Sequence, residues 1–97
     1  MRIISRKTLQ EAWNKHPETE QPLKAWFADV KRSRWASLNE IKDVYPSASI
    51  LHGNRVVFNI KGKKYRLIAK FNFDYQLCWI RFVGTHANYD KINAQNI

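Results

Sequence analysis

The chain has 97 residues, of which 44% are hydrophobic and 13% aromatic, so it can build one modest core and is not a disordered segment. Seventeen Lys and Arg residues against eight Asp and Glu residues give a net charge of +9 and a pI near 10. Residues 1–48 carry nine cations and six acids (+3), whereas residues 49–97 carry eight and two (+6). A basic excess on a folded scaffold favours a nucleic-acid partner, and a basic surface that serves solubility alone is the alternative.

Several classes of protein are excluded by residues that the chain lacks. Cys78 is the only cysteine, so no disulfide forms within the chain and a reducing compartment is compatible. The three histidines are far apart and no glycine-rich phosphate loop occurs, so we expect neither a metal site nor a cofactor. No apolar run reaches the length of a membrane span, and the first ten residues lack a secretory core. We expect a cytoplasmic protein with one domain over residues 1–97 and no membrane contact.

The N-terminus is predicted to form a strand followed by a helix. Residues 2–5 are short and β-branched at their centre, which is typical of a strand that joins a sheet. Ser5 is predicted to cap a helix from Lys7 to about His16, and Pro17 to end that helix.

Two further helices are predicted before the strand region. One begins between Thr19 and Pro22, and the other follows a capping box of Ser37 and Glu40 and stops before Tyr45. Residues 46–54 are predicted to form a loop with a turn at Gly53-Asn54. Apolar residues at helical spacing on the first two helices are expected to cover one sheet face: Leu9, Ala12, Trp13, Leu23, Trp26, Phe27 and Val30.

Residues 55–90 are predicted to contain three consecutive strands. A hairpin loop at Gly62-Lys63 would place Val56, Phe58 and Ile60 opposite Ala69, Leu67 and Tyr65. A four-residue turn over residues 74–77 would place Phe73, Phe71 and Ala69 opposite Cys78, Ile80 and Phe82. One face is then apolar apart from the Tyr65 hydroxyl.

The opposite face of these strands carries cations and no acid. The predicted pairing aligns Arg55, Lys70 and Arg81 in one row, and Asn59, Arg66 and Thr85 in another. Like charges directly opposite one another destabilise a sheet, so this arrangement indicates a face that binds a polyanion.

Polar residues that follow the last strand suggest acid–base chemistry. Thr85 and His86 open a short turn or helix on which His86, Tyr89 and Asp90 share one side. Together with nearby arginines, such a set suits phosphodiester cleavage by the 2′-hydroxyl of RNA, which requires a base, an acid and cations but no metal. A purely structural role, in which Thr85 and His86 cap the strand and Asp90 pairs with Lys91, fits these residues equally well.

The segments FNIKGKKYRLIAKFNF and CWIRFVGTHANYDKI, with MRIISRKTLQEAW and SLNEIKDVYPSAS, resemble the HigB toxins of type II toxin–antitoxin systems. The resemblance covers nearly the whole chain and implies an α+β, RelE-like fold: two to three helices packed on one face of a small, mainly antiparallel sheet. It also implies cleavage of mRNA on the translating ribosome. The implied partners are ribosomal RNA and a HigA-type helix-turn-helix antitoxin, with operator DNA bound through the complex.

The resemblance places Arg66 near the scissile phosphate and matches His86, Tyr89 and Asp90 to the closing motif. Our hypothesis makes His86 the acid or base, Arg66 and Arg81 the groups that stabilise the phosphorane, and Tyr89 and Asp90 the groups that orient His86 or the nucleotide. Cations expected to contact RNA backbone or ribosomal RNA are Arg55, Lys61, Lys63, Lys64 and Lys70. The alternative is a non-catalytic RNA- or ribosome-binding module, and a DNA-binding partner without activity is the third reading.

Overall fold

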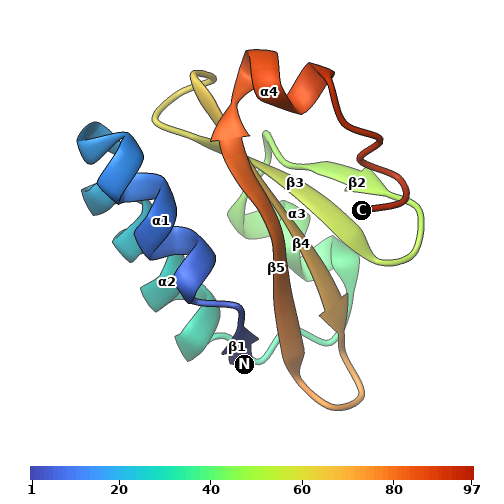
Figure 1. The fold of residues 1–97 in the computed structure, drawn as a ribbon. Helices are drawn as coiled ribbons and strands as arrows, with labels where there is room; N and C mark the ends of the chain where they lie inside the picture. The colour runs from blue at the N-terminus through green and yellow to red at the C-terminus, as the bar shows by residue number, and fades with distance from the viewer.

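A computed structural model describes residues 1–97 and shows a twisted sheet with a layer of helices on one face (Figure 1). The five strands follow the order β1-β5-β4-β3-β2, and every neighbouring pair is antiparallel except β1 and β5. This is the predicted α+β, RelE-like architecture. In chain order the elements are β1 (Arg2–Ile4), α1 (Lys7–Lys15), a 3₁₀ turn (Pro17–Thr19), α2 (Glu20–Arg32), α3 (Leu38–Val44), β2 (Ser49–Leu51), β3 (Arg55–Ile60), β4 (Tyr65–Asn72), β5 (Leu77–Thr85) and α4 (His86–Asp90).

Helices α1, α2 and α3 bury their apolar sides against one face of the sheet, as predicted. Buried side chains from these helices reach zero to 2% exposure, and the inward residues of β3 and β4 reach zero to 4%. Aromatic rings link the layers, since the Phe58 ring lies 5.4 Å from Trp26 and 5.2 Å from Tyr45. None of the helices combines the length and the apolar composition that crossing a bilayer requires.

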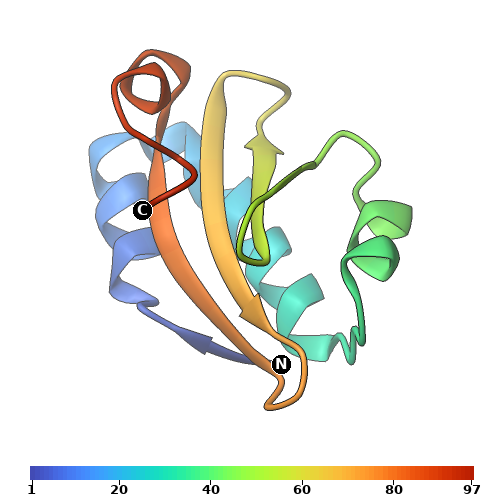
Figure 2. The ribbon, with the colours of Figure 1, turned by 90° about the vertical axis from the view of Figure 1, so that its right-hand side faces the viewer.

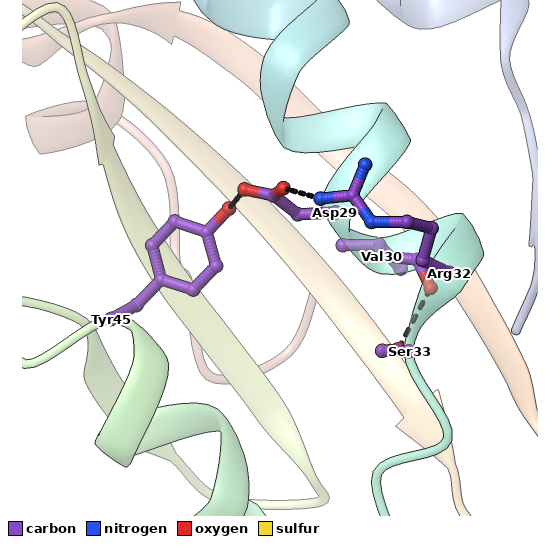
Figure 3. Close-up of polar contacts among 5 residues, drawn as sticks. All are labelled: Asp29, Val30, Arg32, Ser33 and Tyr45. Atoms are coloured by element: carbon purple, nitrogen blue, oxygen red, sulfur yellow. Dashed lines mark hydrogen bonds and ion pairs between the residues drawn. The ribbon is translucent and has the colours of Figure 1, made fainter.

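A polar contact joins α2 to α3 over the core (Figure 3). The Tyr45 hydroxyl donates to Asp29 Oδ2 at 2.6 Å, and Arg32 Nη2 lies 2.5 Å from the other carboxylate oxygen. Burial and the neighbouring carboxylate raise the pKa of Tyr45, so the hydroxyl stays protonated and remains a donor.

The β3–β4 hairpin has the predicted pairing. Ile60, Phe58 and Val56 lie opposite Tyr65, Leu67 and Ala69. The chain turns through Gly62 in the left-handed region, and the Lys64 N–H donates to the Lys61 carbonyl at 3.4 Å. Glycine at this position allows the positive φ at no steric cost.

The predicted β4–β5 pairing is wrong, because the turn lies one residue earlier than expected. Residues 73–76 form it, and Phe71 therefore lies opposite Cys78 instead of Ile80. Asn72 fixes this position, since its Oδ1 accepts the Tyr75 N–H at 3.0 Å. Such an Asx turn competes with continuation of the strand.

A β-bulge at Arg81 then changes which residues face the core. Ala69 lies opposite Ile80 but its neighbour Ile68 lies opposite Phe82, which leaves Arg81 without a partner in the ladder. The extra residue turns Phe82 to the face away from the helices and lets Val83 pack against the core. The predicted pair of Ala69 with Phe82 is also wrong, because the earlier turn places Ile80 opposite Ala69.

The earlier turn changes the first of the predicted cross-strand rows, and the turn and the bulge together change the second. Arg55 and Lys70 are adjacent as expected, but Trp79 completes their row in place of Arg81. Asn59 and Arg66 are likewise adjacent, and Gly84 completes that row in place of Thr85.

Two local predictions in the N-terminal half are wrong. Ser5 does not cap α1, because its backbone has φ +72° and no side-chain cap is formed; its carbonyl accepts the Thr8 N–H instead. Residues 46–54 are not all loop, because Ser49–Leu51 forms β2 and pairs with β3 across the Gly53-Asn54 turn. β2 is an edge strand of three residues, and its Ile50 is 41% exposed. Its apolar pattern is therefore too short for the strand to be predicted from the sequence.

Candidate active site

The outer face of the sheet, opposite α1–α3, faces the viewer in Figure 2. Helix α4 follows directly from β5 at one end of this face, and the C-terminal segment runs from α4 across it (Figure 2). The outer face and α4 carry most of the residues that the sequence predicted to act on RNA.

Four of the predicted site residues meet where α4 joins the outer face. Arg66 Nη2 lies 3.2 Å from His86 Nε2, and His86 Nδ1 lies 3.2 Å from Asp90 Oδ2. The Arg66 guanidinium also lies 4.8 Å from the centre of the Tyr89 ring. The histidine side chain remains 49% exposed, so it is accessible to a substrate.

Short-range sequence features hold this cluster in place. Thr85 caps α4, because its hydroxyl accepts the Asn88 N–H at 3.1 Å. The His86 N–H donates to the Lys64 carbonyl at 3.3 Å, which ties the start of α4 to the β3–β4 hairpin. Helical spacing then places Asp90 beside His86, as predicted, and the structure pairs Asp90 with His86 rather than with Lys91.

The partners of His86 determine which nitrogen can accept a proton. An arginine side chain can only donate, so Nε2 accepts from Arg66, and Nδ1 therefore carries the hydrogen and donates to Asp90. This assignment leaves the basic lone pair at Nε2, next to the guanidinium. A neutral imidazole held by a carboxylate beside a fixed cation is equipped to take a proton near a phosphate.

Two buried polar atoms next to the cluster lack a partner. Arg66 Nε and Asn59 Oδ1 are both buried without a hydrogen bond, and these residues are cross-strand neighbours. Asn59 uses its Nδ2 to donate to the Ser47 carbonyl at 3.2 Å. Arg66 therefore has bonding capacity left beyond its contact with His86.

The lysines of the β3–β4 hairpin differ in whether an acidic side chain compensates their charge. Lys61 and Lys63 are exposed and have no acidic partner, whereas Lys64 Nζ lies 3.5 Å from Glu18 Oε2. Glu18 also accepts the Tyr65 hydroxyl at 2.6 Å. Hydrogen bonds, chiefly from Tyr65, lower the pKa of Glu18 to about 2, so its charge compensates Lys64 throughout the neutral range.

Three other predicted residues lie outside the cluster. Arg81 is exposed at the β-bulge and makes no contact with His86 or Arg66. Lys70 is half-buried further along β4, opposite Trp79. Arg55 Nε donates to the backbone oxygen of Ile97 at 2.8 Å, so the C-terminal segment occupies this side chain.

Sequence reasoning missed two features around the site. The clamp of Glu18 on Tyr65 and Lys64 joins segments 47 residues apart, and no local pattern signals it. Trp79 was overlooked on the outer face, although its odd number and its alternation with Cys78 and Ile80 could have placed it there. No group of three or more His, Cys, Asp or Glu side chains lies close enough together to hold a metal ion.

Helices on one face of a mainly antiparallel five-stranded sheet form a RelE-like fold. A sequence model of the HigB toxins, described as the RelE-like toxic component of a toxin-antitoxin system, matches residues 19–92. The chain belongs to this HigB toxin family, and its partner is therefore an antitoxin.

Curated relatives are similar over almost the full chain. The mRNA interferase toxin HigB of Escherichia coli strain K12 is 31% identical over 96 residues, which cover 97% of this chain and 92% of the relative. The mRNA interferase HigB of Shigella flexneri has the same identity and coverage. The mRNA interferase HigB of Escherichia coli O6:H1 is 26% identical over 94 residues, which cover 95% of this chain and 91% of the relative.

Proposed function

We propose that this protein is an endoribonuclease that cleaves mRNA on the translating ribosome and thereby stops translation and growth. The observation that carries the proposal is the Arg66–His86–Asp90 chain on an exposed, basic sheet face, with His86 Nε2 as the available base. Relatives of the same family carry the name mRNA interferase. The protein then acts in the cytoplasm, where ribosomes translate.

In the proposed mechanism, the 2′-hydroxyl of one nucleotide attacks its own 3′-phosphate. Once the Arg66 guanidinium turns from His86 Nε2 to the phosphate, Nε2 takes the hydroxyl proton. Asp90 holds the ring through Nδ1 and stabilises the imidazolium that forms. Arg66, already 3.2 Å from Nε2, neutralises the charge that develops on the phosphorane. The bond from phosphorus to the 5′-oxygen breaks and leaves a 2′,3′-cyclic phosphate.

The leaving 5′-oxygen needs a proton, and we assign its donor to Tyr89. This is the only hydroxyl-bearing side chain in the cluster, and its ring lies under the Arg66 guanidinium. Arg81 is reassigned to RNA backbone, because it is exposed at the bulge without a cross-strand partner and lies outside the cluster of Arg66 and His86. Lys61, Lys63 and Lys70 serve the same purpose on mRNA or ribosomal RNA. Lys64 joins them only when Glu18 releases it, and Arg55 only when the C-terminal segment does.

The test is expression of the chain alone in cells, with growth measured and mRNA 5′ ends mapped. Wild-type protein should arrest growth and cut translated messages, whereas His86→Ala and Arg66→Ala should each restore growth while keeping the wild-type circular dichroism spectrum. Fragments should end in 2′,3′-cyclic phosphate, which distinguishes 2′-hydroxyl attack from metal-assisted hydrolysis. Full toxicity of both variants would contradict the assignment.

A non-catalytic RNA- or ribosome-binding module is the second candidate, since the basic outer face supports it independently of His86. That function predicts growth arrest and RNA affinity that persist in His86→Ala, with no cleavage products.

The proposed antitoxin is of the HigA type, with a helix-turn-helix domain through which the complex binds operator DNA. Co-expression of such an antitoxin should abolish both cleavage and growth arrest.

A further inference from the structure

A hollow beside the β4–β5 turn, at one end of the outer face, lies away from the cluster around His86. It has a volume of about 470 Å³, and the half-buried Trp79 and Lys70 line it together with Asn54, Asn72 and Phe73. Asp74, in the turn between β4 and β5, is the only acid on its wall. None of these residues belongs to the cluster of Arg66, His86, Tyr89 and Asp90.

The groups in this hollow match the parts of a nucleotide. Trp79 and Lys70 are directly opposite in the β4–β5 ladder, so an indole ring and an ammonium stand side by side. An aromatic ring stacks on a nucleobase, and a lysine compensates the phosphate next to it. Asn72 uses its Oδ1 for the Tyr75 N–H, which leaves its Nδ2 to donate to the edge of a base.

Packing alone does not account for a tryptophan at this position. The core is on the opposite face, where Cys78 and Ile80, the neighbours of Trp79, are zero and 3% exposed. Trp79 instead retains exposed surface on a face whose cations face no acid along the strands. An aromatic ring beside a cation on a basic surface is typical of single-strand recognition.

The hollow is also positioned to bind the strand that the His86 cluster cuts. Lys70 is four residues from Arg66 along β4, which corresponds to about 13 Å on the same face. Between the two sites, β5 presents exposed Arg81 and then Phe82, whose ring lies 6.5 Å from Tyr89. Cations and aromatic rings therefore continue from one site to the other.

We propose that the Trp79–Lys70 hollow binds an unstacked nucleobase of RNA, a few nucleotides from the scissile phosphate. The base is stacked on Trp79, its phosphate is compensated by Lys70, and its edge is contacted by Asn72. This inference rests on the proposed function and adds a second RNA contact to it. The base belongs to the mRNA itself or to ribosomal RNA beside it.

The first experiment measures binding of a short single-stranded RNA to the His86→Ala protein by fluorescence anisotropy, so that the RNA stays intact. Adding Trp79→Ala should weaken binding about 5- to 100-fold, and Trp79→Phe should keep most of the affinity. Tyr75→Ala is the matched control, because Tyr75 is an aromatic residue of the adjacent turn and is 77% exposed. It should change affinity less than two-fold.

The second experiment replaces one nucleotide at a time by an abasic residue, which removes the base and keeps the phosphate. One position should weaken binding to the His86→Ala protein, and the same position should have no effect once Trp79→Ala is added. The same variants are compared on ribosomes programmed with mRNA. Loss of affinity on free RNA assigns the base to mRNA, whereas loss only on ribosomes assigns it to ribosomal RNA.

The inference is overturned if Trp79→Ala binds free RNA and ribosomes as Tyr75→Ala does, or if Trp79→Ala weakens binding to free RNA while no abasic position does. Failure of the proposed function is read separately, as the absence of mRNA cuts by the protein with His86 intact. If that protein cleaves mRNA but its RNA binding does not depend on Trp79, the proposed function holds and only the base-binding role of the hollow is contradicted.

Discussion

At the scale of single residues, Glu18 has an influence beyond its own turn. Its carboxylate accepts the Tyr65 hydroxyl at 2.6 Å and lies 3.5 Å from Lys64 Nζ, and the Lys64 carbonyl in turn holds the His86 N–H. The connection between α1 and α2 therefore reaches the hairpin that supports the active site. Because the pKa of Glu18 is lowered to about 2, the contact makes stability depend on pH.

Glu18→Gln should lower stability most above pH 4.5. The folded-state pKa lies below the unfolded value of about 4.3, so the contribution is complete above that value and is lost as the pH falls toward 2. Urea unfolding of wild type and Glu18→Gln between pH 7 and pH 3 checks this. The gap between the two midpoints should narrow with acidification, and a gap that stays constant would show that the Glu18 charge is not responsible.

Cys78 provides a second residue-scale prediction. It is fully buried on the core face, and burial raises the pKa of its thiol to about 12. At pH 8 the folded protein should therefore not react with a thiol reagent such as Ellman's reagent, because the thiolate is the reactive form. One thiol per chain should react after unfolding in guanidinium. Stoichiometric reaction in buffer would show that β5 opens readily.

At the scale of elements, local sequence patterns predicted the β3–β4 hairpin but not the β-bulge in β5. The β3–β4 hairpin follows from Gly62 and from alternation, and its pairing was predicted residue by residue. Alternation cannot indicate an extra residue, since Arg81 followed by Phe82 reads as an ordinary polar–apolar pair. The bulge is why the predicted inward position of Phe82 failed, whereas the row of three cations failed because the turn lies one residue earlier than expected.

The cluster of Arg66, His86, Tyr89 and Asp90, the candidate active site, was more predictable than the pairing of β5. His86, Tyr89 and Asp90 depend on the local geometry of α4, and Arg66 depends on the correctly predicted hairpin. The contacts that join distant segments, from Glu18 to Tyr65 and from Arg55 to Ile97, have no local signature. They form only once the chain has folded.

Deleting Arg81 and replacing it by alanine should have different effects. Deletion removes the extra residue, so Phe82 would turn to the core, Val83 to the outer face, and the start of α4 would shift. We expect a stability loss of about 2 kcal/mol or more and no cleavage. Arg81→Ala keeps the bulge and should change stability by less than about 0.5 kcal/mol. Thermal unfolding of both proteins tests the difference, and equal stability would contradict a structural role of the bulge.

At the scale of the whole molecule, the +9 charge is divided between two layers with different environments. On the helix layer, Lys24 pairs with Glu20 and Arg32 pairs with Asp29. On the side of the outer face and the hairpin, Lys64 has an acid and Arg55 has the backbone of Ile97. On β3, β4, β5 and the hairpin loop, the cations with neither an acidic partner nor the backbone of Ile97 are Lys61, Lys63, Arg66, Lys70 and Arg81.

This division predicts the salt dependence of RNA binding. Each phosphate that a protein neutralises on a single strand contributes about −0.7 to the slope of log affinity against log salt, so five available cations predict a slope of about −3.5. Glu18→Gln releases Lys64 and should steepen the slope by about 0.7, because one more cation reaches RNA. Lys7→Ala is the control, since exposed Lys7 begins α1 on the helix layer and should leave the slope unchanged. Anisotropy titrations between about 50 and about 300 mM salt measure the three slopes, with His86→Ala as the parent protein. A slope that Lys7→Ala makes less steep by about 0.7 would mean that RNA also binds the helices.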